Sequence, residues 1–592
     1  MKKLILVVAF LKALVLLVVI PLFGFGVSRW VLHDMNAELA KENANLTIRQ
    51  LCTPEMLSQF PSLQALCDEV QPIFWMQNCS IISGVTAILL LLSFIFFSVV
   101  AGKSRTRIAI IFPPLVFCSL LVLSVLVLIQ GAILTYGAYL AESTAIQRVH
   151  FFLIGGIGIG ALVGAVSLIR SSFKLALKQK HSVIGTTLNP TSHPVIFSFV
   201  QDIAKKLGAS PPDNIVVGFE PNFYVTSAGV SVIGDDKMLT GETLFLSLPL
   251  TRIFTQEEIK AVIGHELGHF RGQDTYYSRK FSPVYVGLTH AVSAMATEES
   301  ENISSGIAKI PALVLLSYML DVFHRNISTI GREREFDADK AATEVAAPTA
   351  LATSLLKISL YAHAWDNLQK KTISRLEQGK ITRNISQLFS STVKYDINKE
   401  SQLDVLSNIA QETISHPTDS HPLTANRMQQ LGVQMESIDN SLLSFPTESS
   451  INLIEDHIAL EEKLTILQQQ YYVALGAQVP DESDINYGAT LLAAFGAHMV
   501  LADGKVEKEE IDNAEAIGVG LSKDFDRIDF REYCHYPETL PPIEDLIDTV
   551  SEMSAEAKTA IYGYLKEIAY ADNEISLEEN NLLNQVKNNL MN

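Results

Sequence analysis

Four long hydrophobic runs in the first 170 residues constrain this chain more than any other feature of its sequence. A helix needs about 20 consecutive apolar residues to cross a bilayer. The runs that reach this length are residues 4–27, 81–101, 108–129 and 151–169. We therefore predict a mainly helical membrane protein with four N-terminal transmembrane helices, followed by a large soluble part.

The first run begins directly after Lys2 and Lys3, as the hydrophobic part of a signal peptide does. It is long, contains Lys12 and has no clear small-residue cleavage site, so we favour a retained anchor over a cleaved signal. Both alternatives begin with the basic end of the chain in the cytoplasm.

Basic residues near the other runs predict their orientation, because short loops rich in lysine and arginine stay in the cytoplasm. Lys103, Arg105 and Arg107 separate the second run from the third, and a basic segment at 170–180 follows the fourth. Residues 28–80 are then expected to face outward, and the soluble part is expected to lie in the cytoplasm.

The cysteines contain no C-x-x-C pair, so they indicate neither a thiolate zinc site nor a thioredoxin-type motif. Cys52 and Cys67 fall in the outward-facing loop, where oxidising conditions allow a disulfide. The sequence leaves this pairing open, and Cys79 would be left over.

The net charge of −19 argues against a nucleic-acid partner, because phosphate binding requires a cluster of lysine and arginine that the sequence lacks. An excess of acidic residues is an ordinary property of a solvated surface. At 592 residues the chain is also too long for one core, so several domains are expected.

The part after the last run alternates between helical and extended patterns. Residues 192–207 have apolar positions at helical spacing. Four short stretches rich in β-branched and aromatic residues follow at 215–219, 223–226, 230–233 and 244–248. They predict a small antiparallel sheet.

A helix after this sheet carries the clearest chemical pattern. Thr255 and Glu258 have the spacing of a capping box, which opens a helix, and the segment His265-Glu-Leu-Gly-His269 follows. Side chains four residues apart share a helix face, so the two imidazoles can bind one zinc ion. Glu266 lies beside them, where it can accept a proton from water.

Gly264 and Gly268 lower the helix propensity of the same segment, by about 1 kcal/mol each relative to alanine. Such a cost indicates that another backbone packs closely against the helix. We therefore expect a tightly packed active-site helix.

A catalytic zinc ion normally has three protein ligands, so a third must come from elsewhere in the chain. The acidic run 331–342 is the best candidate, because Arg332, Glu335 and Asp339 share one helical face. Glu335 would bind zinc, and Asp339 would orient one of the histidines. Taken alone, such a charged run is more often a solvated helix face.

The transmembrane runs, the His265-Glu-Leu-Gly-His269 motif and the segment Arg332-x-x-Glu335-Phe-x-Ala-Asp339 together resemble the HtpX-like and CAAX-prenyl-protease-like family of membrane zinc metallopeptidases. The resemblance covers roughly residues 172–430. It implies a zincin-like α+β peptidase domain of the gluzincin type, with one zinc ion per chain. The implied ligands are the two histidines and Glu335, with Glu266 as the catalytic base.

A later element, Ser420-His-Pro-Leu-Thr-Ala-Asn-Arg427, also resembles one of this family. The resemblance implies that His421 lies near the metal and stabilises the oxyanion, and that Arg427 braces the acidic helix. His416 offers a competing register, but only His421 has the family's spacing to Arg427.

Asn222, Phe223 and Tyr224 occupy the place of the family's cleft-lining strand, with which an extended substrate could pair. The family's usual Asn-Ala-Phe is replaced by Asn-Phe-Tyr, which changes the expected subsite. Family members often have two further spans between the paired motifs, whereas the segments 281–297 and 307–323 are short and contain charged residues. An even number of crossings is required for one metal site, and we favour helices that dip into or lie on the bilayer.

Two segments near the C-terminus, 502–510 and 571–579, repeat one another. Their Ala-Asp-Gly/Asn-x-Val/Ile pattern resembles the helical TerB-like, tellurite-resistance-type domain over about residues 484–590. Asp503 and Asp572 can accept hydrogen bonds in each turn, so capped helix starts explain the repeats better than a metal site, and the ligand spacing of an EF-hand is not met. We expect an all-α bundle that recruits a partner or substrate.

These patterns predict a transmembrane region at 1–171 with its outward loop at 28–80, a peptidase domain at 172–435, a helical linker at 436–483 and a TerB-like domain at 484–592. The expected function is zinc-dependent endoproteolysis of membrane proteins in quality control or stress response, at the bacterial inner membrane with the catalytic domain facing the cytoplasm. An inactive scaffold that recruits partners and a processing protease for one membrane substrate are the alternatives. The Lys-Lys start, compact loops and TerB-like tail look bacterial, which argues against prenylated substrates.

Overall fold

The structure is a computed structural model of the whole chain. It describes residues 2–41, 46–176, 180–235, 237–271, 273–297, 303–396, 422–434, 438, 443, 445–479, 487–523, 525–551, 553–571 and 575–590. Contacts divide the chain into two compact units, Met1–Gln179 with Gly272–Arg334 and Lys180–Arg271 with Glu335–Asn592.

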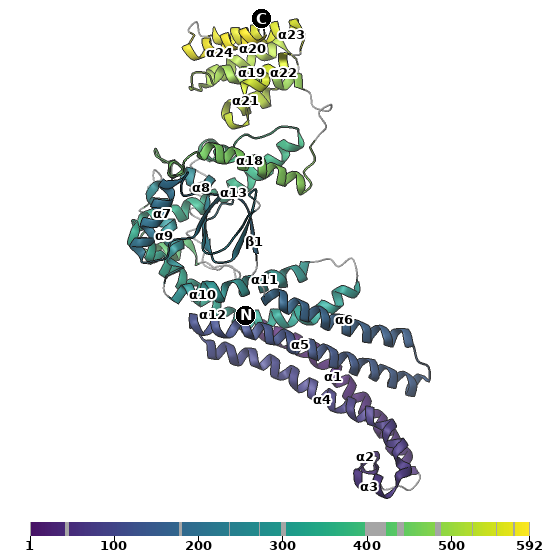
Figure 1. Cartoon of the computed structure of the whole chain (residues 1–592). Helices are drawn as coiled ribbons and strands as arrows, with labels where there is room; N and C mark the ends of the chain where they lie inside the picture. Colours follow the sequence, from purple (N-terminus) through teal and green to yellow (C-terminus); the bar gives the residue numbers. More distant parts are fainter. Residues whose placement is uncertain are drawn as a thin grey trace. The chain divides into compact units, whose positions relative to one another are not determined.

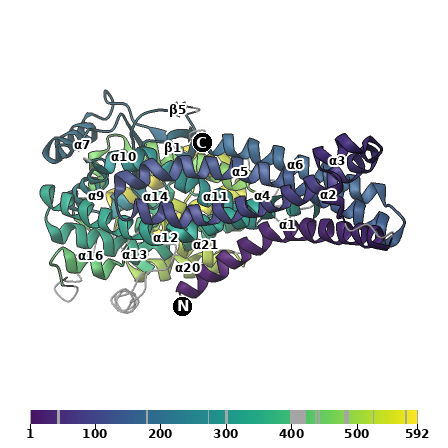
Figure 2. The same cartoon turned by 90° about the horizontal axis from the view of Figure 1, so that it is seen from below.

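The first unit is built on four long helices that run side by side in Figures 1 and 2. They are α1 (Lys2–Lys41), α4 (Gln64–Ala101), α5 (Arg105–Ala141) and α6 (Phe151–Ala176). Within the described part of the chain, these four are long and apolar enough to cross a membrane. The prediction of four apolar N-terminal helices is therefore confirmed.

The segment between α1 and α4 holds two short helices, α2 (Ile48–Leu51) and α3 (Pro54–Gln59). A disulfide joins Cys52, just after α2, to Cys67 in the first turns of α4. The pairing that the sequence left open is thus present in the structure.

Three helices of the first unit come later in the chain: α10 (Gln273–Lys280), α11 (Ser282–Thr297) and the first part of α12 (Ile303–Val345). Residues of α12 such as Phe323 share one buried apolar cluster with Phe94 of α4 and Phe112 of α5. The Ser98 hydroxyl donates to the carbonyl of Val322 at 3.2 Å, and Asn326 Nδ2 donates to the carbonyl of Ser98 at 2.7 Å. This part of α12 therefore packs on the long apolar helices, and its depth in a bilayer stays a prediction.

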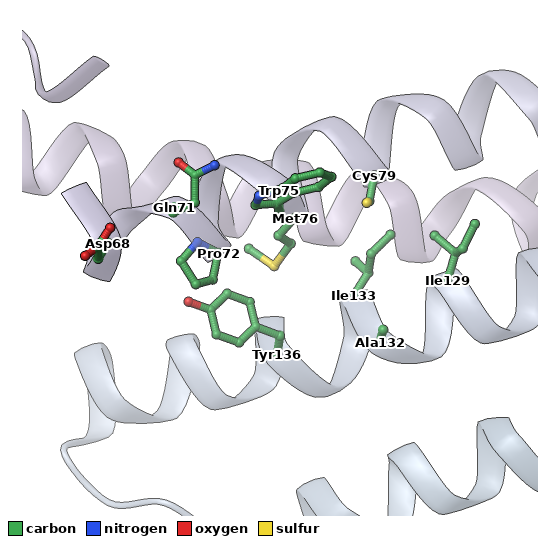
Figure 3. A pocket seen from close by; sticks show the side chains of 10 residues that line it. All are labelled: Asp68, Gln71, Pro72, Trp75, Met76, Cys79, Ile129, Ala132, Ile133 and Tyr136. Atoms are coloured by element: carbon green, nitrogen blue, oxygen red, sulfur yellow. The ribbon is translucent and has the colours of Figure 1, made fainter. Parts of the chain in front are cut away.

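A cavity of about 610 Å³ lies between α4 and α5 (Figure 3). Its wall is mostly apolar, with Trp75, Met76 and Cys79 from α4 facing Ile133 and Tyr136 from α5. It shares no residue with the histidine motif, so we assign it no part in catalysis.

The second unit contains a six-stranded sheet in the order β3-β6-β2-β1-β4-β5. The strands are β1 (Lys180–Thr187), β2 (Asn214–Gly218), β3 (Tyr224–Thr226), β4 (Gly229–Ile233), β5 (Lys237–Leu239) and β6 (Thr243–Ser247). Four of the six were expected, whereas β1 and β5 were missed.

The expectation of a purely antiparallel sheet is wrong, because β1 pairs with β4 and β2 with β6 in parallel register. The strands that pair in parallel are far apart in the sequence. Helix α7 (Pro194–Leu207) follows β1, and three strands separate β2 from β6. A hairpin fixes an antiparallel direction only where the connection is short, as it is between β4 and β5.

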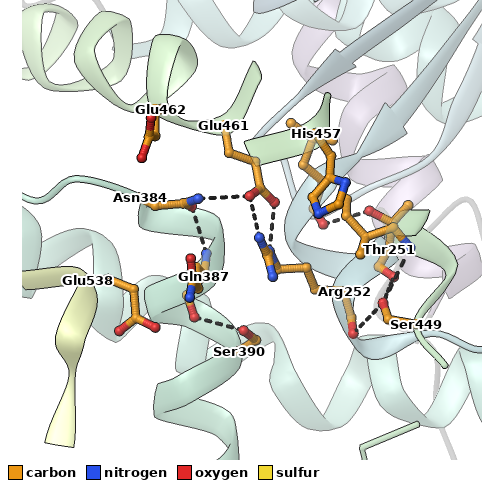
Figure 4. Close-up of polar contacts among 12 residues, drawn as sticks. Thr251, Arg252, Asn384, Gln387, Ser390, Ser449, His457, Glu461, Glu462 and Glu538 are labelled. Atoms are coloured by element: carbon orange, nitrogen blue, oxygen red, sulfur yellow. Dashed lines mark hydrogen bonds and ion pairs between the residues drawn. The ribbon is translucent and has the colours of Figure 1, made fainter. Parts of the chain in front are cut away.

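Helices α8 (Leu248–Ile253), α9 (Gln256–Gly268), α13 (Pro348–Glu377) and α14 (Ile385–Asp396) complete the core of this unit with α7, and the short helix α16 (Thr424–Gln430) follows later in the chain. Helix α18 (His457–Ala474) packs against β1 and α14. Its Glu461 is fully buried and accepts hydrogen bonds from Arg252 Nε at 2.7 Å and Asn384 Nδ2 at 2.8 Å (Figure 4). These bonds join α18 to α8 and to the residue just before α14.

The last part of the second unit is an all-α bundle with its own core, as expected. Phe495, Tyr564 and Val586 lie at the centre of this core. Its helices are α19 (Tyr487–Val500), α20 (Lys508–Leu521), α21 (Arg527–His535), α22 (Ile543–Ser551), α23 (Ala555–Ala569) and α24 (Leu577–Leu590), with the 3₁₀ turn η6 (Pro537–Thr539) after α21.

Candidate metal centre

Helix α9 begins with the capping box that the sequence predicts. Thr255 Oγ1 accepts from the backbone N–H of Glu258 at 3.1 Å, and the Glu258 carboxylate accepts from the N–H of Thr255 at 2.8 Å. The helix then runs to Gly268, with His269 as its C-terminal cap. His265 therefore lies in the last turn of α9, and His269 directly follows that helix.

The two glycines of α9 lie against the last turns of α12. A Cβ at Gly264 would lie 2.6 Å from Cγ2 of Val345, and a Cβ at Gly268 would lie 2.9 Å from Cβ of Ala341 and 3.1 Å from Cα of Ala338. These distances leave no room for a methyl group. The expected close packing of another backbone is confirmed, and it brings the acidic end of α12 onto the histidine helix.

Glu335 of α12 meets both histidines of α9. Its Oε2 lies 3.5 Å from Nε2 of His265, and its Oε1 lies 3.4 Å from Nε2 of His269. One ligand atom from each of the three residues lies within 4.8 Å of the other two. The three residues expected as ligands are thus brought together on two helices.

Asp339 lies one helical turn after Glu335 and contacts the second ring nitrogen of His265. Its Oδ1 lies 2.9 Å from Nδ1 of His265, which leaves Nε2 of that ring on the side of Glu335. Arg427 of α16 donates to both oxygens of Asp339, from Nε at 2.9 Å and from Nη2. Arg427 therefore joins α16 to the acidic end of α12.

Burial and the neighbouring carboxylates act in opposite directions on the pKa values of the two histidines. Burial disfavours a charged His265, yet hydrogen bonds to Asp339 and Glu335 outweigh burial and raise the pKa of His265 to about 9. Burial lowers the pKa of His269, whose ring therefore favours the neutral form.

The donor set fits a zinc ion. Two imidazole nitrogens and one carboxylate are ligands that catalytic zinc sites use, leaving a further position for water or substrate. A carboxylate on the far nitrogen of a ligand histidine, as Asp339 provides for His265, fixes the ring and its tautomer.

His421 and Arg332 were also predicted as site residues. His421 lies outside the described residues, so its role stays a prediction. Arg332 is an exposed residue of α12.

The predicted substrate-binding segment, residues 222–224, combines an edge strand with a buried side chain. Strand β3 is at the edge of the sheet, where an extended peptide could pair. Phe223 is buried and stacks on Phe254, so its side chain shapes the core beneath the strand. Asn222 accepts from the N–H of Phe223, and Tyr224 stacks on Phe245.

One buried charge near the centre was not predicted. Lys357 of α13 is almost completely buried, and its Nζ donates to the Glu258 carboxylate at 2.9 Å and to the carbonyl of Ile253 at 3.0 Å. The sequence signal was a lysine within the apolar stretch Leu-Leu-Lys-Ile-Ser-Leu, which reads equally well as an exposed position of a helix.

Comparison with known proteins agrees with this geometry. Residues 198–434 match the model of peptidase family M48, and residues 489–591 match that of the tellurite resistance protein TerB. The chain therefore carries an M48 peptidase domain of the HtpX-like kind followed by a TerB domain.

Individual relatives are distant. The chain is 25% identical over 237 residues to a protease HtpX homolog of Archaeoglobus fulgidus, which covers 39% of this chain and 64% of the relative. It is 24% identical over 238 residues to a protease HtpX homolog of Thermoplasma volcanium, covering 38% of this chain and 72% of the relative. A bacterial protease HtpX homolog, from Polynucleobacter necessarius, is 25% identical to the chain over 181 residues. The match covers 29% of this chain and 57% of the relative. No solved structure shows a significant match.

Proposed function

We propose that this protein is a membrane-bound zinc metalloendopeptidase that holds one zinc ion per chain with His265, His269 and Glu335. The observation that carries the proposal is the convergence of these three residues, from two helices packed through Gly264 and Gly268, in a buried cluster. The M48 match over the same residues supports it independently.

A zinc ion in this site would supply Lewis acidity, which polarises a peptide carbonyl and makes water more acidic. Glu266 follows His265 directly and acts as the general base: it accepts the proton of the attacking water and returns it to the leaving amine. Asp339 and Arg427 keep the ring of His265 in place during these steps. His421 would stabilise the developing oxyanion.

The proposed substrates are membrane proteins that are damaged or incompletely folded, and the proposed setting is quality control or stress response. Four apolar helices on the same chain as the peptidase domain support a membrane location. The basic loops at 103–107 and 170–180 support a cytoplasmic catalytic domain in a bacterial inner membrane. An extended substrate segment would pair with the edge strand β3.

The deciding experiment uses the full-length protein in detergent and measures bound zinc and cleavage of an unfolded polypeptide such as casein. Glu266→Gln should retain one zinc ion per chain while the cleavage rate falls by about 10²- to 10⁴-fold, because the ligands remain and only the base is removed. Glu335→Gln should lose the metal as well.

Glu257→Gln is the matched control, since Glu257 is an exposed carboxylate of the same helix that pairs with Lys260. It should keep both zinc and activity. Cleavage by purified Glu266→Gln at the wild-type rate would refute the proposed mechanism. Bound zinc with no cleavage by the wild type of any unfolded substrate would favour the inactive scaffold.

A further inference from the structure

The C-terminal bundle contacts the peptidase domain through a compact set of charged groups on α21 and η6. Glu532 of α21 pairs with Arg375 at 2.8 Å and with Lys371 at 3.2 Å, both on α13. Asp529 of α21 pairs with Lys380, just after α13, at 2.6 Å.

The turn after α21 adds contacts with α14 and the segment before it. Glu538, labelled in Figure 4, accepts from the hydroxyl of Ser391 at 2.8 Å, and its backbone carbonyl accepts from the N–H of Arg383 at 3.0 Å. Tyr536 is buried in the apolar core of the peptidase domain, with Nζ of Lys371 4.4 Å from its ring centre. Tyr536 and the ion pairs around it therefore form the surface through which the bundle contacts the peptidase domain. We call this the docking surface.

This docking surface does not have the composition of a permanent interface. Permanent interfaces are apolar at their centre and depleted of charge, whereas Arg375, Asp529 and Glu538 are all less than 8% exposed. Among the described residues, Nε of Arg375, Oδ2 of Asp529 and Oε2 of Glu538 are buried without a hydrogen-bond partner. Water would satisfy each of these atoms if the domains separated.

Burial and ion pairing act on the carboxylate of Asp529 in opposite directions. Burial raises the pKa of Asp529 above its ordinary value, although Lys380 and Arg375 act in the opposite direction. The ion pair with Lys380 therefore offsets only part of the cost of burying this carboxylate.

Helix α13 connects the docking surface to α9, the metal helix, which carries His265. Arg375 lies near its C-terminal end, and Lys357, which binds the Glu258 carboxylate at the start of α9, lies 18 residues earlier, or about 27 Å along the helix axis. Between them, Leu360 and Leu368 pack in the same core as Ile259 of α9. Helix α13 thus packs against both the C-terminal bundle and the helix that carries His265.

We propose that the TerB domain is a detachable regulatory arm, and that its docking on α13 and α14 keeps the metal helix α9 in the zinc-binding position. This inference rests on the proposed function for its effect on zinc, while the docking itself does not.

The test exchanges the charges of one docking pair in the full-length protein. Asp529→Lys and Lys380→Glu should each raise amide hydrogen exchange in α21 and η6 and lower zinc affinity at least threefold. The double variant restores an opposite-charge pair in reversed order and should return both measurements toward wild type. Asp548→Lys is the control, because Asp548 is an exposed residue of α22 and its replacement makes the same change of charge; this variant should alter neither measurement.

Unchanged exchange of α21 in both single variants would overturn reversible docking. Increased exchange of α21 with zinc affinity within twofold of wild type would overturn the link to the metal site. Exchange of α23 shows whether Asp529→Lys has unfolded the bundle, and Lys380→Glu changes only the peptidase side. Should the wild type bind no zinc, the proposed function fails, and exchange of residues 259–263 then tests the coupling alone: no increase on undocking would overturn it.

Discussion

Oδ1 of Asp339 lies 2.9 Å from Nδ1 of His265, and Arg427 donates to both oxygens of the same carboxylate. Asp339→Ala should lower zinc affinity by about 10- to 100-fold, because the ring of His265 loses the acceptor that orients it. The zinc affinity of Asp339→Asn should lie between those of wild type and Asp339→Ala, since an amide oxygen can still accept a hydrogen bond from Nδ1 of His265. Competition with a chelator measures the affinities.

Glu344→Gln is the control for this pair of variants, because Glu344 is a residue of the same helix and pairs with Arg271 outside the cluster. Its zinc affinity should stay within about twofold of wild type. An Asp339→Ala protein with wild-type affinity would show that the ring of His265 is fixed by other contacts.

The glycines of α9 give a second prediction. Gly264→Ala should destabilise the peptidase domain by about 1–3 kcal/mol, since the added Cβ would lie 2.6 Å from Cγ2 of Val345. The gain in helix propensity, about 1 kcal/mol, acts against this loss. Thermal unfolding of the purified protein is the measurement.

Val345→Ala removes the contacting methyl group, so the double variant should be more stable than the sum of the two single effects predicts. A Gly264→Ala protein that unfolds at a higher temperature than wild type would contradict the packing argument.

How far the sequence predicts this site depends on whether the signal is local. The capping box at Thr255 and the face shared by His265 and His269 follow from helix geometry alone, and the structure contains both arrangements. The convergence with Glu335 was not a local signal. It was implied by the family resemblance, and the close approach through Gly264 gives its physical basis.

Long-range features could not be predicted in the same way. The direction of β2 relative to β6 depends on how the intervening strands are routed, and no residue of either strand encodes it. Lys357 was missed because a lysine in a helix is usually exposed, and its partner Glu258 is 99 residues away in the sequence. The docking pairs of α21 with α13 depend likewise on the tertiary arrangement.

The buried pair of Lys357 and Glu258 leads to a third prediction. Lys357→Met should destabilise the protein by roughly 3–5 kcal/mol, because it leaves the Glu258 carboxylate buried without its cation. Adding Glu258→Gln removes that charge and should recover part of the loss. Denaturant unfolding measures both, and two strictly additive losses would show that the charges are not coupled.

The disulfide between Cys52 and Cys67 tests the orientation of the whole chain. Disulfides persist in oxidising compartments and are rare in the cytoplasm, so protein isolated from membranes with thiols blocked should change its gel mobility on reduction. Cys52→Ser should abolish the change, and Cys79→Ser should keep it, because Cys79 is not disulfide-bonded. The bridge closes a loop of 15 residues and should add about 3 kcal/mol to the stability of this segment. A wild-type protein whose Cys52 and Cys67 are both free in the cell would place the 28–80 loop in the cytoplasm, and the metal centre could then no longer be assigned to that side from the basic loops.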